Sequence, residues 1–324
     1  MPSESSVERF QPVVKASLPT VDVVIVNWNT GEHLRECLVS IGRSQRRNFD
    51  LARIVIVDNA SHDDSLHGVE DLPLPIRVVR NSANRGFGAA SNQGAREGSS
   101  EFILLLNPDA RVFRDTIDLT VAFMHDPSNA AVGICGARMV NEDGTDEFSC
   151  WRFPTFWMWA AKITGLAHFF PGSIELQRMT NEEVGGSGVV DQVIGAYNLI
   201  RRPVFESLHG FDERFFMYLE DVDFALRARE LGYSSYFLAD VPVHHVGRVS
   251  SEQVRARRVF YLLRSRTEYA RKHWPRWQSR LLAALILFVE FPVRCGVAVA
   301  GRGGTVREVA EAACWYARYL VDGR

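Results

Sequence analysis

Short apolar runs alternate with segments of helical spacing along the first third of the chain. Four such runs, rich in valine, isoleucine and leucine, predict strands at residues 21–27, 54–58, 76–79 and 102–107. Residues 34–41 show the spacing of an amphipathic helix. We therefore predict a mostly parallel α/β sheet, and strands this uniformly apolar are expected to be covered by helices on both faces.

The alternation becomes less regular after residue 131. One helix is expected to begin near Glu220 and to stop before Gly232. A shorter one begins at Pro203, since proline is tolerated in a first turn. Helices are also expected to fill the chain after residue 250. Further strands are predicted at residues 132–140, 193–200 and 235–238.

Composition narrows the class of protein. The chain has 324 residues, of which 46% are hydrophobic and 23% charged, as in a globular protein with a substantial core. Its formal net charge of −2 gives no overall attraction to nucleic acid. Five widely spaced cysteines form no CxxC motif, which favours a reducing, cytoplasmic location. The polar residues 1–19 lack a signal-peptide core and are expected to form a flexible lead.

Residues 281–300 raise the question of a membrane. The segment is apolar, but it carries Glu290, Pro292 and Arg294, and its uninterrupted apolar run is only nine residues long. A spanning helix needs about 20 residues. Because arginines are frequent in the preceding stretch, residues 255–280, one interpretation is a helix that lies on an anionic membrane surface. The other is a helix that packs on the protein's own core.

Polar residues follow three of the predicted strands where each strand ends. The first strand ends in Asn27-Trp28-Asn29, the second in Asp58-Asn59-Ala60-Ser61 and the fourth in Asn107-Pro108-Asp109. Each group on its own is typical of a turn or a helix cap. Ligands of open parallel sheets bind beyond the carboxyl ends of the strands. Three polar groups at one sheet edge therefore indicate a binding site.

A glycine-rich stretch, NRGFGAAS, occupies residues 84–91. It reads GxGxxS where a dinucleotide fingerprint has GxGxxG, and it follows the third predicted strand instead of the first. Both departures argue against a nicotinamide cofactor. A glycine turn before a helix still allows the backbone to approach a phosphate or a nucleotide closely.

Three carboxylates, Glu220, Asp221 and Asp223, lie at the start of one predicted helix. Acids in a first turn are favoured by the helix dipole, so this cluster has a structural explanation as well as a catalytic one. Further along, His244 and His245 are adjacent. Neighbours on a strand point to opposite sides, so at most one of these histidines is expected to face a shared site.

Taken together and in order, these segments resemble the family 2 inverting glycosyltransferases. Within that family they are most similar to bacterial rhamnosyltransferases of cell-wall and O-antigen assembly. The resemblance covers about residues 20–250, and its longest and most specific block is residues 195–233. The other matching segments are VVIVNWN, IVIVDNASHD, NRGFGAASNQG, LLLNPDA and HHVGRVS.

The resemblance implies a GT-A fold, a nucleotide-sugar donor and a divalent metal, Mg²⁺ or Mn²⁺. It implies that Asp58 contacts the nucleobase, that Trp28 lies against the nucleotide and that the glycine-rich stretch borders the donor. The implied nucleotide-sugar-binding residues are Asn27, Trp28, Asn29, Asp58, Asn84, Arg85, Gly86, Asn107 and Asp109.

The family's metal-binding DxD motif reads Asn107-Pro108-Asp109 here, so one carboxylate is replaced by a neutral amide. The family's histidine near the end of the domain is matched better by His245 than by His244. The implied metal ligands are therefore Asp109 and His245, with diphosphate oxygens and water filling the remaining positions.

In the family the second residue of the Glu-Asp pair is the general base, and that residue is Asp221 here. Glu220 and Asp223 would then orient the base, cap the helix or bind acceptor hydroxyls. The implied reaction is a single displacement with inversion, in which a carboxylate takes the acceptor's proton.

Resemblance to the subgroup favours dTDP-L-rhamnose as donor, and a glycan or polyprenyl-linked glycan as acceptor. Aromatic side chains suit the C–H faces of sugars, so an acceptor is expected to lie near some of them. The candidates are Tyr197, Phe216, Tyr218, Trp157 and Trp159.

The expected organisation is a GT-A domain at residues 20–250 and a helical extension at 251–324, for which membrane contact and packing on the protein's own core both stay open. Residues 20–130 would bind the nucleotide sugar, and residues 131–250 would bind the acceptor and carry out catalysis. Two alternatives keep this fold, namely another nucleotide-sugar donor and a non-catalytic binding module. A nucleotidyltransferase is disfavoured because NWNTGEHL, after the first strand, lacks lysine and arginine.

Overall fold

The computed structural model describes residues 17–169, 177–179, 181–247, 255–301 and 304–323. Most of the flexible lead expected at residues 1–19 lies outside these ranges. The expected domain boundary at residue 250 and the end of the HHVGRVS motif also lie outside them.

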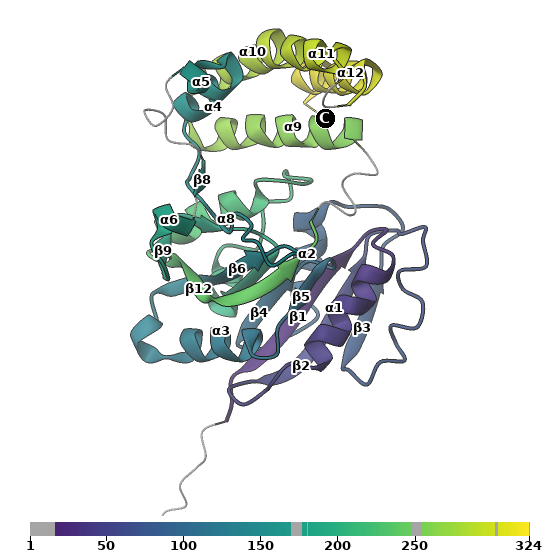
Figure 1. The fold of residues 1–324 in the computed structure, drawn as a ribbon, viewed down its shortest axis with the longest axis vertical. Coiled ribbons are helices and arrows are strands. Elements are labelled where there is room, and N and C mark those ends of the chain that lie inside the picture. Colours follow the sequence, from purple (N-terminus) through teal and green to yellow (C-terminus); the bar gives the residue numbers. More distant parts are fainter. Residues whose placement is uncertain (1–16, 170–176, 180, 248–254, 302–303, 324) are drawn as a thin grey trace, which may run out of the picture.

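Within the described residues, nine strands form one mixed sheet (Figure 1). Its order is β3-β2-β1-β4-β11-β6-β12-β5, with β9 added on β12. The pairs β1–β2, β2–β3 and β1–β4 are parallel, as the sequence pattern predicts. The pair β12–β6 is also parallel. The bounds are β1 Thr20–Asn27, β2 Asp50–Asp58, β3 Ile76–Arg80, β4 Phe102–Leu106, β5 Ala110–Val112, β6 Val132–Val140, β9 Gly188–Val190, β11 Tyr197–Arg201 and β12 Ser234–His245.

Helices cover both faces of this sheet because the strands are apolar on both sides. On β1, Val21, Val23 and Ile25 pack in one core cluster with α1 and α3, whereas Val24 packs in another on the opposite face. That opposite face is covered by α2, α7 and α8. The bounds are α1 Glu32–Gly42, α2 Phe87–Ala95, α3 Thr116–His125, α7 Arg202–Ser207 and α8 Glu220–Glu230.

A helical layer lies at the α8 end of the sheet domain (Figure 1). Its core cluster joins Leu263 of α9, Leu282 of α10 and Tyr316 of α12 to Phe215 and Val222 around the start of α8. The bounds are α4 Phe156–Thr164, α5 Leu166–Phe169, α9 Arg255–His273, α10 Arg276–Leu285, the π-helix η3 Ile286–Glu290, α11 Phe291–Val299 and α12 Val306–Asp322.

Short elements connect the sheet to this layer. A three-stranded sheet in the order β10-β7-β8 lies between them, with the short helix α6. The bounds are β7 Cys150–Trp151, β8 Arg178–Met179, β10 Gln192–Val193 and α6 Asn181–Val184. Elsewhere, the 3₁₀ helix η1 Pro127–Asn129 follows α3.

Two predicted strands differ from the structure. The strand expected at 235–238 is in fact β12, which runs to His245 because it continues to pair with β6 and then with β5. Its pairing shifts register between Leu238 and Pro242, where the apolar pattern also breaks. The run expected at 193–200 is divided between β10 and β11.

Candidate active site

The first two strands end side by side, which brings their polar residues together. Asn27 and Asp58 are paired positions of the parallel strands β1 and β2. The Asn27 amide donates to Asp58 Oδ1 at 3.0 Å and to Ser65 Oγ at 2.8 Å, and its side chain is fully buried. Asn27 therefore orients Asp58 from within the protein. Sequence reasoning missed Ser65, which carries no motif of its own.

The loop after β2 is held by residues that follow β1. The backbone N–H of Asn29 donates to Ser61 Oγ at 3.1 Å, and Asn29 Oδ1 accepts from the backbone N–H of His62 at 2.8 Å. Ser61 Oγ in turn donates to Asp58 Oδ1 at 2.6 Å. Trp28, between the two asparagines, is half-buried. These bonds fix the surroundings of Asp58 before any ligand binds.

The glycine-rich stretch contacts the loop that precedes α8. Gly86 has a φ of 85°, and a Cβ atom there would lie 2.3 Å from the carbonyl oxygen of Phe216, so only glycine fits. The next residue, Phe87, donates its backbone N–H to that same carbonyl at 2.8 Å. Asn84 Oδ1 accepts from the Gly86 N–H at 2.9 Å, while the Arg85 side chain is exposed.

The turn after β4 meets the end of β12. His245 Nε2 lies 3.5 Å from Asp109 Oδ1, and both side chains are buried. Burial alone would raise the pKa of the Asp109 carboxyl, but the hydrogen bond and positive charge of His245 outweigh it and lower that pKa. Burial would lower the pKa of His245, but Asp109 and Glu147 raise it to about 9.

The two neighbouring histidines point to opposite sides of β12, as expected for a strand. His244 Nδ1 lies 3.0 Å from the guanidinium of Arg111, away from Asp109. Burial and the charge of Arg111 lower the pKa of His244. Of the two histidines, His245 is therefore the one that the structure brings to the Asn107-Pro108-Asp109 turn.

Glu147 is a site residue that the sequence did not reveal. Its Oε2 lies 2.9 Å from His245 Nδ1, so Nε2 is left facing Asp109. A carboxylate on the second ring nitrogen fixes the orientation of a histidine, as the outer partners of metal-bound histidines do. Glu147 follows a turn and matches no motif, so only the folded contact identifies it.

Asp221 is held at the start of α8 by several hydrogen bonds. The Gln192 amide donates to its Oδ2 at 2.9 Å, and the backbone N–H of Val222 donates to its Oδ1 at 2.8 Å. Burial raises the pKa of Asp221 to about 6, although bonds from Val222, Gly195 and Gln192 act to lower it. Ala196 follows Gly195, and its carbonyl oxygen accepts a hydrogen bond from the Asn107 backbone N–H at 3.0 Å. Residues 195–196 therefore connect Asp221 to the Asn107-Pro108-Asp109 turn.

Glu220 is buried beside Asp221, and its Oε2 has no hydrogen-bond partner. Burial and the neighbouring Asp221 charge raise its pKa well above the usual range. The two residues before it, Tyr218 and Leu219, have positive φ angles of 72° and 67°. Non-glycine residues rarely adopt this conformation, and such strain concentrates at functional sites.

The sequence profile described as "Glycosyl transferase family 2" matches residues 22–207, which is more than half of the chain. The chain belongs to this family. The expected α/β GT-A fold is thereby confirmed. A mannosyltransferase from Pyrobaculum calidifontis, solved with GDP-Man and Mn²⁺, superposes with a TM-score of 0.54 at 18% identity over 95% of this chain and 89% of that one.

Curated relatives of this glycosyltransferase include rhamnosyltransferases. An N-acetylglucosaminyl-diphospho-decaprenol L-rhamnosyltransferase of Mycobacterium tuberculosis is 27% identical over 69% of this chain and 75% of its own length. Rhamnosyltransferase WbbL of Escherichia coli is 26% identical over 49% of this chain and 59% of its own length. The predicted resemblance to family 2 enzymes of this kind is therefore confirmed.

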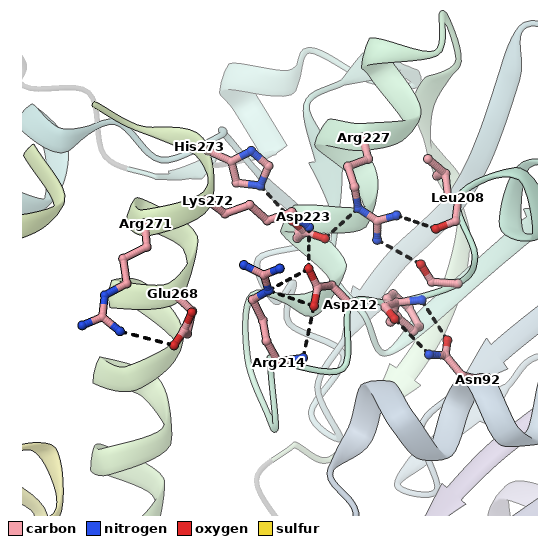
Figure 2. Close-up of polar contacts among 12 residues, drawn as sticks. Asn92, Leu208, Asp212, Arg214, Asp223, Arg227, Glu268, Arg271, Lys272 and His273 are labelled. Carbon is pink, nitrogen blue, oxygen red and sulfur yellow. Dashed lines mark hydrogen bonds and ion pairs between the residues drawn. The ribbon is translucent and has the colours of Figure 1, made fainter. Parts of the chain in front are cut away.

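In this glycosyltransferase Asp223 joins α8 to the helical layer (Figure 2). The side chain is fully buried, and its Oδ1 lies 2.6 Å from Lys272 Nζ and 2.8 Å from His273 Nε2, both at the end of α9. Its Oδ2 accepts from Arg227 Nε at 2.8 Å. Burial would raise the pKa of Asp223, but His273, Lys272 and Arg227 lower it to about 2.

The expectation that Asp223 binds acceptor hydroxyls or caps α8 is not supported. Both carboxylate oxygens are bonded by the side chains of Arg227, Lys272 and His273, and no side chain forms a cap hydrogen bond on α8. Sequence reasoning missed Lys272 and His273, which lie about 50 residues further along the chain. Asp223 is a structural link between α8 and α9.

The aromatic candidates for acceptor binding divide by their burial. Tyr197 is fully buried and its hydroxyl bonds Thr120 Oγ1 at 2.6 Å, so its ring belongs to the core. Trp159, only 2% exposed, packs against α9. The acceptor prediction was wrong for both because tertiary packing covers them. Phe216 and Tyr218 are half-buried in the loop before α8, and Trp157 is 68% exposed.

Proposed function

We propose that the protein is a metal-dependent inverting glycosyltransferase that moves L-rhamnose from dTDP-L-rhamnose onto a hydroxyl of a glycan or polyprenyl-linked glycan. The family supports sugar transfer as the reaction class. The relatives named for L-rhamnosyl transfer, one of them to a diphospho-decaprenol-linked acceptor, support the sugar and the acceptor class.

The observation that carries the proposal is the environment of Asp221. A general base that works near neutral pH performs best when its pKa lies near, and below, the working pH. Burial raises the pKa of Asp221 to about 6, so the group is ionised at pH 7 and still basic enough to accept a proton. Hydrogen bonds from Gln192 and Val222 fix the direction of the carboxylate. Asp221 would take the acceptor's proton as the new bond forms.

Contacts within the site support a donor position between the strand ends and the glycine turn. Asp58 would accept from the nucleobase, and Trp28 would cover one side of the nucleotide. The Gly86 turn lies against the loop before α8, so the two sides of the site are in contact through the Phe216 carbonyl. The sugar would then lie near Asp221. Asn84, Arg85 and Asn107 complete the proposed donor surface.

The residues around Asp109 fit a divalent metal in the presence of the donor. No group of three or more His, Cys, Asp or Glu side chains in the described part of the chain could hold a metal by itself. One carboxylate and one imidazole, Asp109 and His245, suit Mn²⁺ when diphosphate oxygens supply further ligands. A metal held there would neutralise the charge on the departing nucleoside diphosphate.

We expect Glu147→Gln to weaken Mn²⁺ binding by about 10–100-fold, since an outer carboxylate orients the histidine ligand. The measurement is a calorimetric titration of Mn²⁺ into protein saturated with dTDP, which needs no turnover. Glu142→Gln is the matched control, because Glu142 contacts Arg111 on the side of His244. Asp109→Asn should remove Mn²⁺ binding altogether. Unchanged affinity in both Asp109→Asn and Glu147→Gln would place the metal elsewhere.

The test of the function is a panel of nucleotide sugars with Mn²⁺ or Mg²⁺, with nucleoside diphosphate release and sugar transfer measured separately. We expect metal-dependent release of dTDP from dTDP-L-rhamnose above all other donors. Preference for another nucleotide sugar would change the donor and keep the reaction. Donor binding without release, even with lipid-linked and glycan acceptors, would favour a non-catalytic binding module. Failure to bind every nucleotide sugar would reject the proposal.

A further inference from the structure

We infer that the helix Arg276–Val299 is an in-plane docking face for an anionic lipid bilayer. This helix comprises α10, η3 and α11 and lies on the outer side of the helical layer, with α9 between it and the sheet domain (Figure 1). It has 24 residues, and its most apolar 18-residue window has a mean hydropathy of 2.0. By length and composition it could cross a membrane, which exceeds what its nine-residue apolar run indicated.

One side of this helix presents large apolar side chains to solvent. Trp277 is 54% exposed, Phe288 72% and Val293 55%, and Leu281 and Val297 are also exposed. Only 17% of the most apolar 18-residue window is buried. A contiguous apolar surface of this kind is rare on soluble monomers and marks a contact surface.

A second element extends the same surface. Trp157 of α4 is 68% exposed, and its ring centroid lies 5.0 Å from that of Phe156. The ring centroids of Phe156 and Trp277 are 5.6 Å apart. Two exposed tryptophans from different helices therefore flank one buried phenylalanine. Tryptophan is the side chain most favoured at the boundary between lipid and water.

The opposite side of the helix is tied to the protein, which argues against a spanning orientation. Leu282, Ile286 and Phe291 belong to the core cluster shared with α9 and α12. Glu290 is buried and pairs with Arg266 of α9 at 3.3 Å and with Arg294 at 2.6 Å. Crossing the bilayer would separate the helix from this core and leave Arg266 without its partner, at a high energetic cost.

Charge favours an anionic bilayer over a second copy of the chain. Arg276 and Arg280 are exposed at the start of the helix, and its one acid, Glu290, is buried and paired. The face therefore shows positive and apolar groups and no exposed carboxylate. Basic residues next to an apolar helix face are attracted to anionic lipid. A second copy docked through the same face would instead bring two sets of arginines together.

The test is flotation of the full-length protein with phosphatidylcholine vesicles that contain or lack 30% phosphatidylglycerol. We expect the wild type to float with the anionic vesicles, and the double variant Phe288→Glu, Val293→Glu to lose at least 10-fold in partitioning. The matched control is Val189→Glu, Leu231→Glu, which alters two exposed apolar residues of the sheet domain. Thermal melts establish that both variants fold. Equal flotation of wild type and the Phe288, Val293 variant would overturn the proposal.

Further experiments test whether the arginines attract the lipid, whether the helix lies on the bilayer or crosses it, and whether the face binds lipid or a second copy of the chain. Arg276→Gln, Arg280→Gln should weaken anionic binding several-fold, whereas Arg43→Gln, Arg46→Gln should not. Alkaline carbonate should release the wild type, and resistance to it would indicate a spanning helix instead. Light scattering could instead show that the wild type is a dimer, that Phe288→Glu, Val293→Glu is a monomer, and that neither binds vesicles. That outcome would assign the face to self-association. None of these readouts involves a sugar, so their failure leaves the proposed function untouched.

Discussion

Asp221→Asn is expected to lower kcat for sugar transfer by about 10²–10⁴-fold, the usual contribution of a general base. Asparagine keeps the shape of the side chain and can still accept the hydrogen bonds from Gln192 or Val222 at its oxygen. It cannot accept a proton from the sugar hydroxyl. Donor affinity should therefore stay within a few-fold of the wild-type value. The measurements are kcat with saturating donor and dissociation constants by calorimetry.

The pH dependence gives an independent test of the same residue. Because burial raises the pKa of Asp221 to about 6, the logarithm of kcat/KM should rise with pH below about 6 and level off above it. This rise is the acidic limb of the profile, and the residual activity of Asp221→Asn should lack it. Gln192→Leu removes a hydrogen bond that favours the ionised carboxylate, so the limb should move to higher pH. A limb that persists in Asp221→Asn would assign it to another group.

Asp221→Asn should lower kcat without lowering the free energy of unfolding. A carboxyl whose pKa is higher in the folded than in the unfolded protein binds its proton more tightly when folded, so its ionised form opposes folding at neutral pH. Asp221→Asn should therefore be at least as stable as the wild type at pH 7, and any advantage should disappear below about pH 4. A large loss of stability at pH 7 would mean that the activity loss reflects unfolding.

The parts of the fold that could be predicted are those fixed by local pattern. Apolar strands with polar residues at their ends predicted the parallel half of the sheet. The bounds of β1 and β4 lie within one residue of the prediction, whereas β2 ends at the predicted residue and begins four residues earlier than predicted. The extension of β12 could not be predicted, because Asp240 and Pro242 interrupt the apolar pattern. Pairing with β5 and β6 continues the strand regardless.

The site was predictable only where a motif marks a residue. Resemblance to the family pointed to Asp109, His245 and Asp221. In the fold, Asp109 lies against His245, and the bond between Asn107 and Ala196 ties the turn of Asp109 to the residues beside Asp221. Glu147 and Gln192 escaped notice because their importance lies in a partner that is distant in sequence. Burial was the main source of error. An aromatic residue such as Tyr197 looks alike in sequence whether it lines a site or fills the core.

Asp223→Asn is expected to lower the free energy of unfolding by about 3–5 kcal/mol, since it removes the buried carboxylate that Arg227 and Lys272 share. Three side chains bond the carboxylate, namely Arg227, Lys272 and His273 (Figure 2). The measurement is denaturant unfolding at pH 7, followed by both far-ultraviolet circular dichroism and tryptophan fluorescence. A midpoint equal to that of the wild type would show that the cluster contributes nothing net to stability.

Acid dependence and a matched control make this prediction specific. The pKa of Asp223 is lowered to about 2, so its contribution to stability is complete above about pH 4 and is lost as pH falls through 2. Asp212→Asn is the control, because Asp212 shares Lys272 but its side chain is 19% exposed and lies outside the cluster's buried centre. It should cost less than Asp223→Asn, because water screens a partly exposed pair.

The same substitution tests whether α9 helps to hold the loop at residues 216–219, which precedes Asp221. Besides the cluster, Ser265 Oγ donates to the Met217 carbonyl at 2.8 Å, and Tyr261 stacks on Phe216 at 4.3 Å. Loosening α9 should therefore release strain at Tyr218 and Leu219 and displace Asp221. We expect Asp223→Asn to lower kcat more than it raises the KM for donor, under conditions where the protein remains folded. Normal kcat in a destabilised protein would confine Asp223 to stability, and α9 would then be dispensable for catalysis.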